Sequence, residues 1–433
     1  GDAGFSLFLR KAFIKGAGYS DAALDRPVIA IADTGSDYNP CHGNAPQLIE
    51  AVQRGVMLAG GLPMRFPTIS LHESFAAPGD GKDGPANGKT TMAVCVRTSV
   101  PGPKSQALLL AEQNYLAPGI QQISTLAGIA VAGGDGALIE DVDGNRFLDW
   151  VAGIGVASIG HGHKALAQAL SQQAASIVAT SFASPARLEL LARIVEHAPH
   201  PSLNRVQLYS SGAEAVESAL RLARAATGHS EVLAFWGGFH GKTLGVLGLM
   251  GSEWKHGLLP AVPGQHLAPY GDCRSCALRL SPDSCRMACI DFLRDQIRLS
   301  TANRLAAIVV EPIQGTAGNV VPHPSFLPAL AQVAHEHGAL LVVDEMITGF
   351  GRTGDLWAST AAGVVPDIVT FGKGVAAGFP LSGLITRAEL AASRPWADPS
   401  HSSSSFGGNP LACAAANATT RIIIDENLSE NAR

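Results

Sequence analysis

Two charged side chains stand at the ends of segments that are otherwise apolar. Asp344 follows the apolar run LLVV (340–343), and Lys373 follows DIVTFG (367–372). An uncompensated carboxylate at a buried strand end is costly, so Asp344 needs a cationic partner, and a protonated pyridine nitrogen would serve. A lysine at the mouth of an apolar sheet loses its proton more easily and can form a Schiff base. The plainer interpretation of Lys373, taken alone, is a surface lysine after a strand.

A turn of small residues connects a predicted strand to a predicted helix. It has the sequence YSSGAEA, in which Ser211, Gly212 and Ala213 stand at the junction. Small residues let backbone N–H groups and the positive end of the helix approach a phosphate. An ordinary strand-to-helix turn with a serine N-cap is the alternative interpretation.

A second turn places an aromatic ring between glycines. The segment WGGFHG carries Phe239 and His240 directly after another predicted strand. An aromatic ring flanked by glycines can lie flat against a planar ligand, since glycine lets a backbone approach closely. A glycine-rich turn with the aromatic side chain packed beneath it explains the same sequence equally well.

These four sites must be positioned by the elements that precede them. Short apolar strands alternate with helices from about residue 165 onward. The predicted strands are 206–210, 232–236, 306–311, 339–345 and 367–372, and the predicted helices include 213–227 and 326–338. This alternation indicates a parallel α/β sheet covered by helices. Because ligands of such sheets bind at the carboxyl ends of the strands, the four sites are expected to converge.

The composition excludes several other classes of protein. The 433 residues are 46% apolar, enough for two or three domains with large cores, and 15% charged. So few charges argue against a disordered chain, and a net charge of −5 argues against binding to nucleic acid. No apolar run reaches the roughly 18 residues of a membrane span, and no basic-then-apolar leader is present. A cytoplasmic enzyme without membrane or nucleic-acid partners is therefore expected.

Residues 101–433 resemble a class III pyridoxal-phosphate aminotransferase of fold type I. The matching segments are PGPKSQALL, DVDGNRFLDWVAGIGVASIGHGH, SSGAEAVESALRLAR, GGFHGKTLG, VVEPIQG, LLVVDEMITGFGRTG, PDIVTFGKGVAAGFPLSG and SSFGGNPLACAAA. The resemblance implies an α/β fold with a mostly parallel central sheet. It also implies an enzyme that moves an amino group from an amino acid or amine to a 2-oxo acid.

The resemblance gives each candidate residue a role. Lys373 would form a Schiff base with pyridoxal 5′-phosphate and shuttle a proton, and Asp344 would pair with the pyridinium nitrogen. The other implied contacts are Phe239 stacked on the ring with His240 beside it, Gln314 at the 3-hydroxyl, Ser211, Gly212 and Ala213 at the phosphate, and Ser405 at the phosphate of the neighbouring subunit. Ser405 stands where the family usually has threonine. A homodimer with shared active sites is implied.

Two departures from the family leave the substrate open. Relatives that use 4-aminobutyrate have an acidic residue after EPVQG, whereas this chain has Thr316, which cannot form the ion pair that switches between two substrates. The chain stops at Arg433, so the C-terminal small domain, with its arginine for the substrate carboxylate, is expected to be mostly absent.

Residues 1–77 resemble a different family, the dihydroxy-acid and sugar-acid dehydratases. Cys41 in NPCHG matches the first ligand of their iron–sulfur cluster. One thiolate does not hold a cluster that usually needs several, so dehydratase activity is not expected. The segment 28–33 is predicted to be a strand and 47–60 a helix. The start at Gly1 suggests a fragment or a trimmed product, and because the other cluster cysteines are lacking and the resemblance ends near Pro78, we expect a chimeric join rather than a designed bifunctional enzyme.

The expected organisation has four parts. They are a dehydratase-like fragment (1–77), a Gly- and Pro-rich junction (78–103), an aminotransferase small-domain segment (104–165) and the cofactor-binding large domain (166–433). The third part should contain a hairpin with its turn at Asp143-Gly144, a strong turn pair.

Four cysteines form a spaced group in the large domain. Cys273, Cys276, Cys285 and Cys289 have the pattern C-x2-C-x8-C-x3-C. The close pairs have the spacing of metal ligands, but the gap between them is shorter than in zinc ribbons. A zinc knuckle and an insert of reduced thiols both remain open, and no metal is assigned.

Two other functions compete with transamination. Lys373 and Asp344 would also support an amino-acid epimerase or aminomutase of the same family, in which the amino group does not leave with the cofactor. An inactive chimera that carries a dehydratase fragment is the alternative from another class.

Overall fold

The computed structural model describes residues 28–33, 62–67 and 94–433 apart from 259 and 303, together with positions 50, 52–54, 56, 57 and 59. The chain forms two compact units. One contains residues 1–93 and 116–128, and the other contains 94–115 and 129–433. Every candidate site residue belongs to the second unit. The four-part division expected from the sequence stays a prediction.

The described part of the first unit contains two paired strands. Strands β1 (Val28–Asp33) and β2 (Leu62–Pro67) run parallel, with Val28 opposite Leu62. The strand predicted at 28–33 is therefore confirmed, and the predicted helix 47–60 is helical at the six positions 50, 52–54, 56 and 57. Helix α5 (Gln122–Ala127) also belongs to this unit. Cys41 lies outside the described residues.

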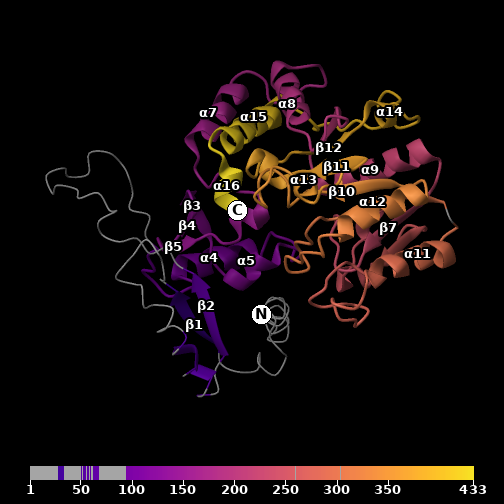
Figure 1. The fold of residues 1–433 in the computed structure, drawn as a ribbon. Coiled ribbons are helices and arrows are strands. Elements are labelled where there is room, and N and C mark those ends of the chain that lie inside the picture. The colour runs from indigo at the N-terminus through magenta and orange to yellow at the C-terminus, as the bar shows by residue number, and fades with distance from the viewer. Residues whose placement is uncertain are drawn as a thin grey trace. The chain divides into compact units, whose positions relative to one another are not determined.

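A seven-stranded sheet forms the centre of the second unit (Figure 1). Its strands are β6 (Arg205–Tyr209), β7 (Glu231–Phe235), β8 (Gln265–Ala268), β9 (Leu305–Val310), β10 (Leu340–Asp344), β11 (Ile368–Phe371) and β12 (Ser382–Thr386). They lie in the order β6-β12-β11-β10-β9-β7-β8. Only β12 is antiparallel to its neighbours, so the predicted, mostly parallel α/β sheet is confirmed. Strands β8 and β12 were not predicted.

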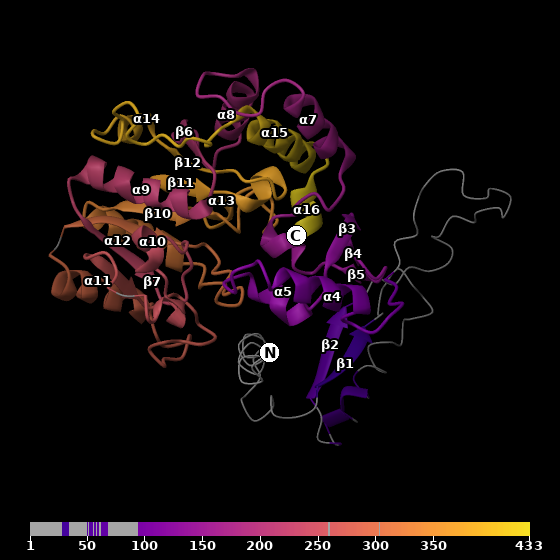
Figure 2. The ribbon, with the colours of Figure 1, turned by 180° about the vertical axis from the view of Figure 1, so that it is seen from behind.

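Helices cover both faces of this sheet (Figures 1 and 2). Because side chains alternate along a strand, Val232 and Ala234 of β7 join the cluster beneath α9 (Gly212–Thr227). Leu233 and Phe235 point the other way, into the cluster formed with α11 (Ala288–Ser300) and α12 (Phe326–Glu336). The strands are buried on both faces, as their continuous apolar sequences predict.

A small antiparallel sheet precedes the large one. Strands β3 (Val131–Asp135), β4 (Leu138–Asp141) and β5 (Arg146–Leu148) form it, and Gly144 in the β4–β5 turn has φ +81°. The hairpin predicted around Asp143-Gly144 is therefore confirmed. The remaining helices are α4 (Pro103–Glu112), α6 (Ala152–Gly155), α7 (Lys164–Ala174), α8 (Pro185–Glu196), α10 (Leu244–Leu247), α13 (Ala358–Ala361), α14 (Ala388–Ala391), α15 (Pro410–Asp425) and α16 (Leu428–Ala432), with 3-10 turns at Glu253–Lys255 and Lys373–Ala376.

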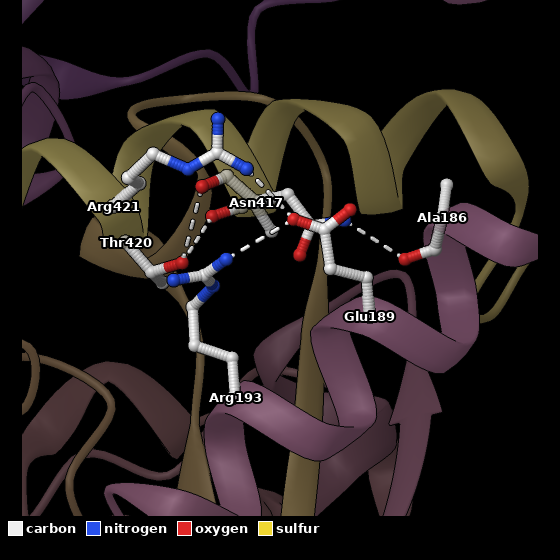
Figure 3. Close-up of polar contacts among 7 residues, drawn as sticks. Ala186, Glu189, Arg193, Asn417, Thr420 and Arg421 are labelled. Carbon is white, nitrogen blue, oxygen red and sulfur yellow. Dashed lines mark hydrogen bonds and ion pairs between the residues drawn. The ribbon is translucent and has the colours of Figure 1, made fainter.

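Helices α8 and α15 pack side by side, and polar groups join them at the rim of their contact (Figure 3). Glu189 accepts hydrogen bonds from Arg193 of its own helix at 3.0 Å and from Arg421 of α15 at 2.8 Å. Asn417 donates from Nδ2 to the carbonyl of Ala186 at 2.9 Å. We call Glu189, Arg193 and Arg421 the rim network.

The longest helices in the described part of the chain are α9 and α15, each of 16 residues. None of the described helices has both the length and the apolar sequence needed to cross a bilayer.

Candidate active site

A cavity of about 290 Å³ lies at the carboxyl edge of the large sheet. Residues that end or follow five of its strands line the cavity, as expected for a parallel α/β sheet. The lining residues at these strand ends and the turns after them include Ser210, Gly212, Ala213, Phe239, His240, Glu311, Thr316, Asp344 and Lys373. The sequence placed six of these nine in the cofactor site, so most of the predicted residues do converge.

Asp344 is the last residue of β10 and is only 2% exposed. Its Oδ2 lies 2.8 Å from His240 Nδ1, and its Oδ1 accepts hydrogen bonds from Thr370 Oγ1 at 2.9 Å and from Met346 N at 3.1 Å. A buried carboxylate held in this way is fixed in orientation and has its charge compensated.

His240 lies beside Asp344 and is equally buried. Burial by itself would lower the pKa of His240, but the hydrogen bond and charge of Asp344, with the charge of Glu311, outweigh burial and raise it. Nδ1 is therefore the donor to the Asp344 carboxylate. The imidazole acts as a support for that carboxylate at the base of the cavity.

Lys373 follows β11 and opens a 3-10 turn, with φ +45°. Burial lowers the pKa of its amine, while the charges of Asp344 and Glu311 oppose that shift. A lysine with a lowered pKa is more often neutral, and the neutral amine is the nucleophile that attacks an aldehyde. Lys373 and Asp344 line the same cavity, so a nucleophile and a buried carboxylate share one small space.

The turn between β6 and α9 offers the positive end of a 16-residue helix to the cavity. Gly212 and Ala213 line the cavity, and a Cβ on Gly212 would lie only 3.0 Å from the sulfur of Met346. Ser211 is exposed and caps the helix, accepting from Glu214 N at 3.3 Å. Ser210 was not predicted. It lines the cavity, and its buried Oγ has no hydrogen-bond partner.

The turn after β7 carries Phe239, which lines the cavity. Gly237 and Gly241 on either side have φ +81° and +126°, which explains why glycine stands at both positions. A Cβ on Gly241 would lie 2.6 Å from the Cβ of Ala213, so this turn abuts the β6–α9 turn. The aromatic ring and the helix end therefore border the same space.

Gln314 and Ser405 lie elsewhere. Gln314 is buried, but it donates from Nε2 to the carbonyl of Trp236 at 2.9 Å and does not line the cavity. This hydrogen bond holds Gln314 against the turn that follows β7. Ser405 is exposed and also lies outside the cavity lining. The contacts expected for these two residues, with the cofactor 3-hydroxyl and with a neighbouring subunit, stay predictions.

Glu311, directly after β9, is a cavity residue that the sequence analysis did not select. It is 6% exposed, and its two oxygens accept backbone hydrogen bonds from Phe239 N at 2.8 Å and Gly315 N at 3.2 Å. Burial raises its pKa to about 7. The signal was available, because Glu311 ends an apolar strand just as Asp344 does.

The four clustered cysteines are all free thiols of intermediate exposure: Cys273, Cys276, Cys285 and Cys289. Among the described residues, no group of three or more His, Cys, Asp or Glu side chains could hold a metal ion. The zinc-knuckle alternative therefore finds no support in the described part of the chain.

The cavity residues fit pyridoxal 5′-phosphate. The unpartnered Oγ of Ser210 lies at the N-terminus of α9, where a phosphate would satisfy it. Asp344 supplies the buried negative charge that a protonated pyridine nitrogen requires, and Lys373 supplies the amine. Phe239 supplies an aromatic surface.

Comparisons with known proteins agree with this chemistry. Residues 121–433 match the family model described as aminotransferase class III, and residues 26–110 match the N-terminal model of dihydroxy-acid/6-phosphogluconate dehydratases. The chain is 37% identical over 307 residues to an acetylornithine aminotransferase of Methanopyrus kandleri, covering 70% of this chain and 72% of that protein. It is 34% identical over 337 residues to a 5-aminovalerate aminotransferase of Pseudomonas aeruginosa, covering 76% of each.

Solved structures give the same result for the fold. An amine transaminase from an uncultivated Pseudomonas species, in its PLP-bound form, has a TM-score of 0.68 at 30% identity, covering 73% of this chain and 76% of that chain. An (S)-enantioselective omega-transaminase from Thermomicrobium roseum has a TM-score of 0.69 at 33% identity, covering 78% and 77%. The predicted fold class, that of the pyridoxal-phosphate-dependent transferases, is therefore confirmed.

Proposed function

The chain belongs to the class III aminotransferases, and from this premise we propose that Lys373 carries the cofactor and moves the proton while Asp344 holds the ring nitrogen. The enzyme is a pyridoxal-phosphate-dependent transaminase that transfers an amino group from a donor to a 2-oxo acid. One observation carries the assignment of residues: Lys373 and Asp344 border the same small cavity at the carboxyl edge of the sheet.

Asp344 keeps the ring nitrogen of the cofactor protonated in this proposal. When bound, pyridoxal phosphate supplies an electron sink that stabilises negative charge at the substrate Cα. A buried carboxylate next to the ring nitrogen strengthens that sink, because it favours the cationic form of the ring. His240 and Thr370 donate to Asp344 and so hold the carboxylate in place.

Lys373 holds and moves a proton at Nζ. Burial lowers the pKa of this amine, so Nζ would hold the aldehyde carbon of the cofactor when the cofactor is bound, and as a neutral amine it would accept a proton from the substrate Cα. The apolar residues Phe379, Pro380 and Leu381 also line the cavity and give its wall an apolar part.

The other residues bind and orient the cofactor. The phosphate of the cofactor is proposed to bind at Ser210, Gly212 and Ala213. Ser211 acts as the N-cap of α9 next to them. Phe239 lies against the ring. We retain Gln314 near the 3-hydroxyl and Ser405 at the phosphate of a neighbouring subunit, because both are implied by the family resemblance. The active unit is proposed to be a cytoplasmic homodimer with shared sites.

The amino donor is an amino acid or an amine. The relatives named above use different donors by their own names, acetylornithine, 5-aminovalerate and amines. Thr316 lines the cavity as a neutral residue, so the wall offers no carboxylate at that position. A panel of donors with pyruvate and 2-oxoglutarate as acceptors identifies the pair.

Borohydride reduction of the loaded enzyme tests the residue assignment. We expect the reduced cofactor to be found on the peptide that contains Lys373, and the Lys373→Ala variant to give no labelled peptide. Lys242 near Phe239 provides an internal control, since its peptide should stay unlabelled. Label on any lysine other than Lys373 would overturn the assignment.

A further inference from the structure

A closed ring of hydrogen bonds joins the end of β6 and the interior of α9 to the segment 396–402. Trp396 Nε1 donates to Ser218 Oγ at 3.1 Å, Ser218 bonds to the hydroxyl of Tyr209, and Tyr209 donates to the carbonyl of Ser402 at 2.9 Å. Ser402 Oγ then donates to the carbonyl of Trp396 at 2.8 Å, which closes the ring. We call these residues, Tyr209, Ser218, Trp396 and Ser402, the serine ring.

The donors in the serine ring follow one direction. Because Tyr209 has a single O–H and gives it to the Ser402 carbonyl, Ser218 must donate to Tyr209. Burial raises the pKa of Tyr209 to about 12, so its hydroxyl keeps the proton. Tyr209 and Ser218 are 1% and 0% exposed. Such a buried, fully satisfied network is rigid, and each bond supports the next.

Two residues of the serine ring, Tyr209 and Ser402, are close in sequence to residues proposed to contact a cofactor. Tyr209 is the last residue of β6, and Ser210 after it lines the cavity. On the other side, Ser402 precedes Ser405 by three residues. Gln207 also donates to the Ser402 carbonyl, at 3.3 Å. A Cβ on Gly407 would lie 2.3 Å from the carbonyl oxygen of Leu208, so this segment lies directly on β6.

We propose that Tyr209, Ser218 and Trp396 are positioning residues that fix segment 402–409 against the end of β6, directly before the phosphate-binding turn. The role of Ser405 at a neighbouring phosphate rests on the proposed function. Given that role, the serine ring connects a subunit's own phosphate turn to the segment that reaches the neighbour's cofactor. Loss of the ring then weakens two contacts at once, that of the phosphate turn with the subunit's own cofactor and that of Ser405 with the neighbour's cofactor.

Amide hydrogen exchange tests the positioning without relying on catalysis. The variants are Tyr209→Phe, which removes one hydroxyl, and Trp396→Phe, which removes one indole N–H. Trp357→Phe is the matched control, because Trp357 Nε1 also donates a hydrogen bond, to the carbonyl of His197 at 2.6 Å, outside the ring. We expect exchange in 400–409 to be about tenfold faster in the two ring variants and unchanged in the control. Unchanged exchange in both ring variants would overturn the proposal.

Cofactor release links the ring to the proposed function. From the loaded enzyme, we expect Tyr209→Phe and Ser405→Ala each to release pyridoxal phosphate about fivefold to tenfold faster, with no further increase in the double variant. Multiplicative effects would refute the coupling between the ring and Ser405. If Ser405→Ala alone has no effect, the role of Ser405 in the proposed function falls, while the exchange experiment still decides whether the ring positions the segment.

Discussion

Two carboxylates of this protein, Asp344 in the cavity and Glu189 in the rim network, are each held by several donors, yet they differ in surroundings. Asp344 is 2% exposed and meets His240 and Thr370. The side chain of Glu189 is 44% exposed and meets two arginines, Arg193 and Arg421, between α8 and α15 (Figure 3). Asp344 has three such partners, counting Met346 N, and Glu189 has two, so the main difference between the two carboxylates is burial.

Because Asp344 is buried, loss of its partners is costly to stability, whereas loss of the partners of the exposed Glu189 costs little. A solvent-exposed ion pair contributes roughly 0–1 kcal/mol, since water solvates either charge when the pair breaks. A buried charge that loses its partner costs roughly 3–5 kcal/mol. The buried polar groups of the cavity are therefore fixed in orientation. The rim network contributes little to stability beyond the packing of α8 against α15.

The largest effect is expected for Asp344→Asn. The amide keeps the shape but cannot hold a ring nitrogen protonated, so turnover should fall by roughly 10²–10³-fold while cofactor binding stays largely intact. Steady-state kinetics and cofactor titration measure both. The control is Asp367→Asn, another buried carboxylate, which accepts from Leu341 N and Arg387 outside the cavity. It should lower stability without a comparable loss of turnover. Near-normal turnover in Asp344→Asn would make that carboxylate structural.

An intermediate, pH-dependent effect is expected for Glu311→Gln. The pKa of Glu311 is about 7 in the folded chain against an ordinary value of 4.5. A raised folded pKa stabilises the protein at low pH, and this contribution is lost as the pH rises through about 7. The free energy of unfolding of the wild type, relative to Glu311→Gln, should therefore fall by about 2 kcal/mol between pH 5 and pH 8.

Denaturant unfolding of the cofactor-free protein at both pH values measures this difference. His240, Asp344 and Lys373 face the same cavity and are present in both proteins, so their own titrations largely cancel. A difference that does not change with pH would show that Glu311 is ionised throughout the range.

The smallest effect is expected for Glu189→Gln. Loss of the charge should change the free energy of unfolding by less than about 1 kcal/mol and leave turnover unchanged, and added salt should reduce even that difference. A loss above about 2 kcal/mol would mean that the rim network is as strongly coupled as the cavity network. Burial would then no longer explain the contrast between the two regions.

The sequence predicted the parts of the site that lie at strand ends. Asp344 and Lys373 follow apolar runs whose parallel arrangement brings them to one edge, and that arrangement depends only on periodicity. Glu311 obeys the same rule and could have been found with it. Ser210 was overlooked because the family resemblance placed Ser211 at the phosphate; in the structure Ser211 is exposed and caps the helix, whereas Ser210 lines the cavity.

The sequence patterns could not predict the geometry of loops or the direction of strands. The turn that begins at Gln314 pairs this residue with Val320 and directs its amide nitrogen to the carbonyl of Trp236. Nothing in the periodicity of a loop specifies this. Strand β12 is likewise short and apolar, and such a segment has the same pattern in either direction, so its antiparallel pairing could not be predicted.

The reversed direction of β12 has a practical consequence for altering the enzyme. Since β11 and β12 are antiparallel neighbours with Phe371 opposite Gly383, the chain from 372 to 381 leaves and re-enters the sheet at the same edge. Gly378, Phe379, Pro380 and Leu381 in this stretch line the cavity. Both anchor points of the loop belong to one strand pair. Ala377 and Gly378 have positive φ and Leu381 belongs to the buried core, so Phe379 and Pro380 are the positions best suited to combinatorial libraries aimed at accepting bulkier amines.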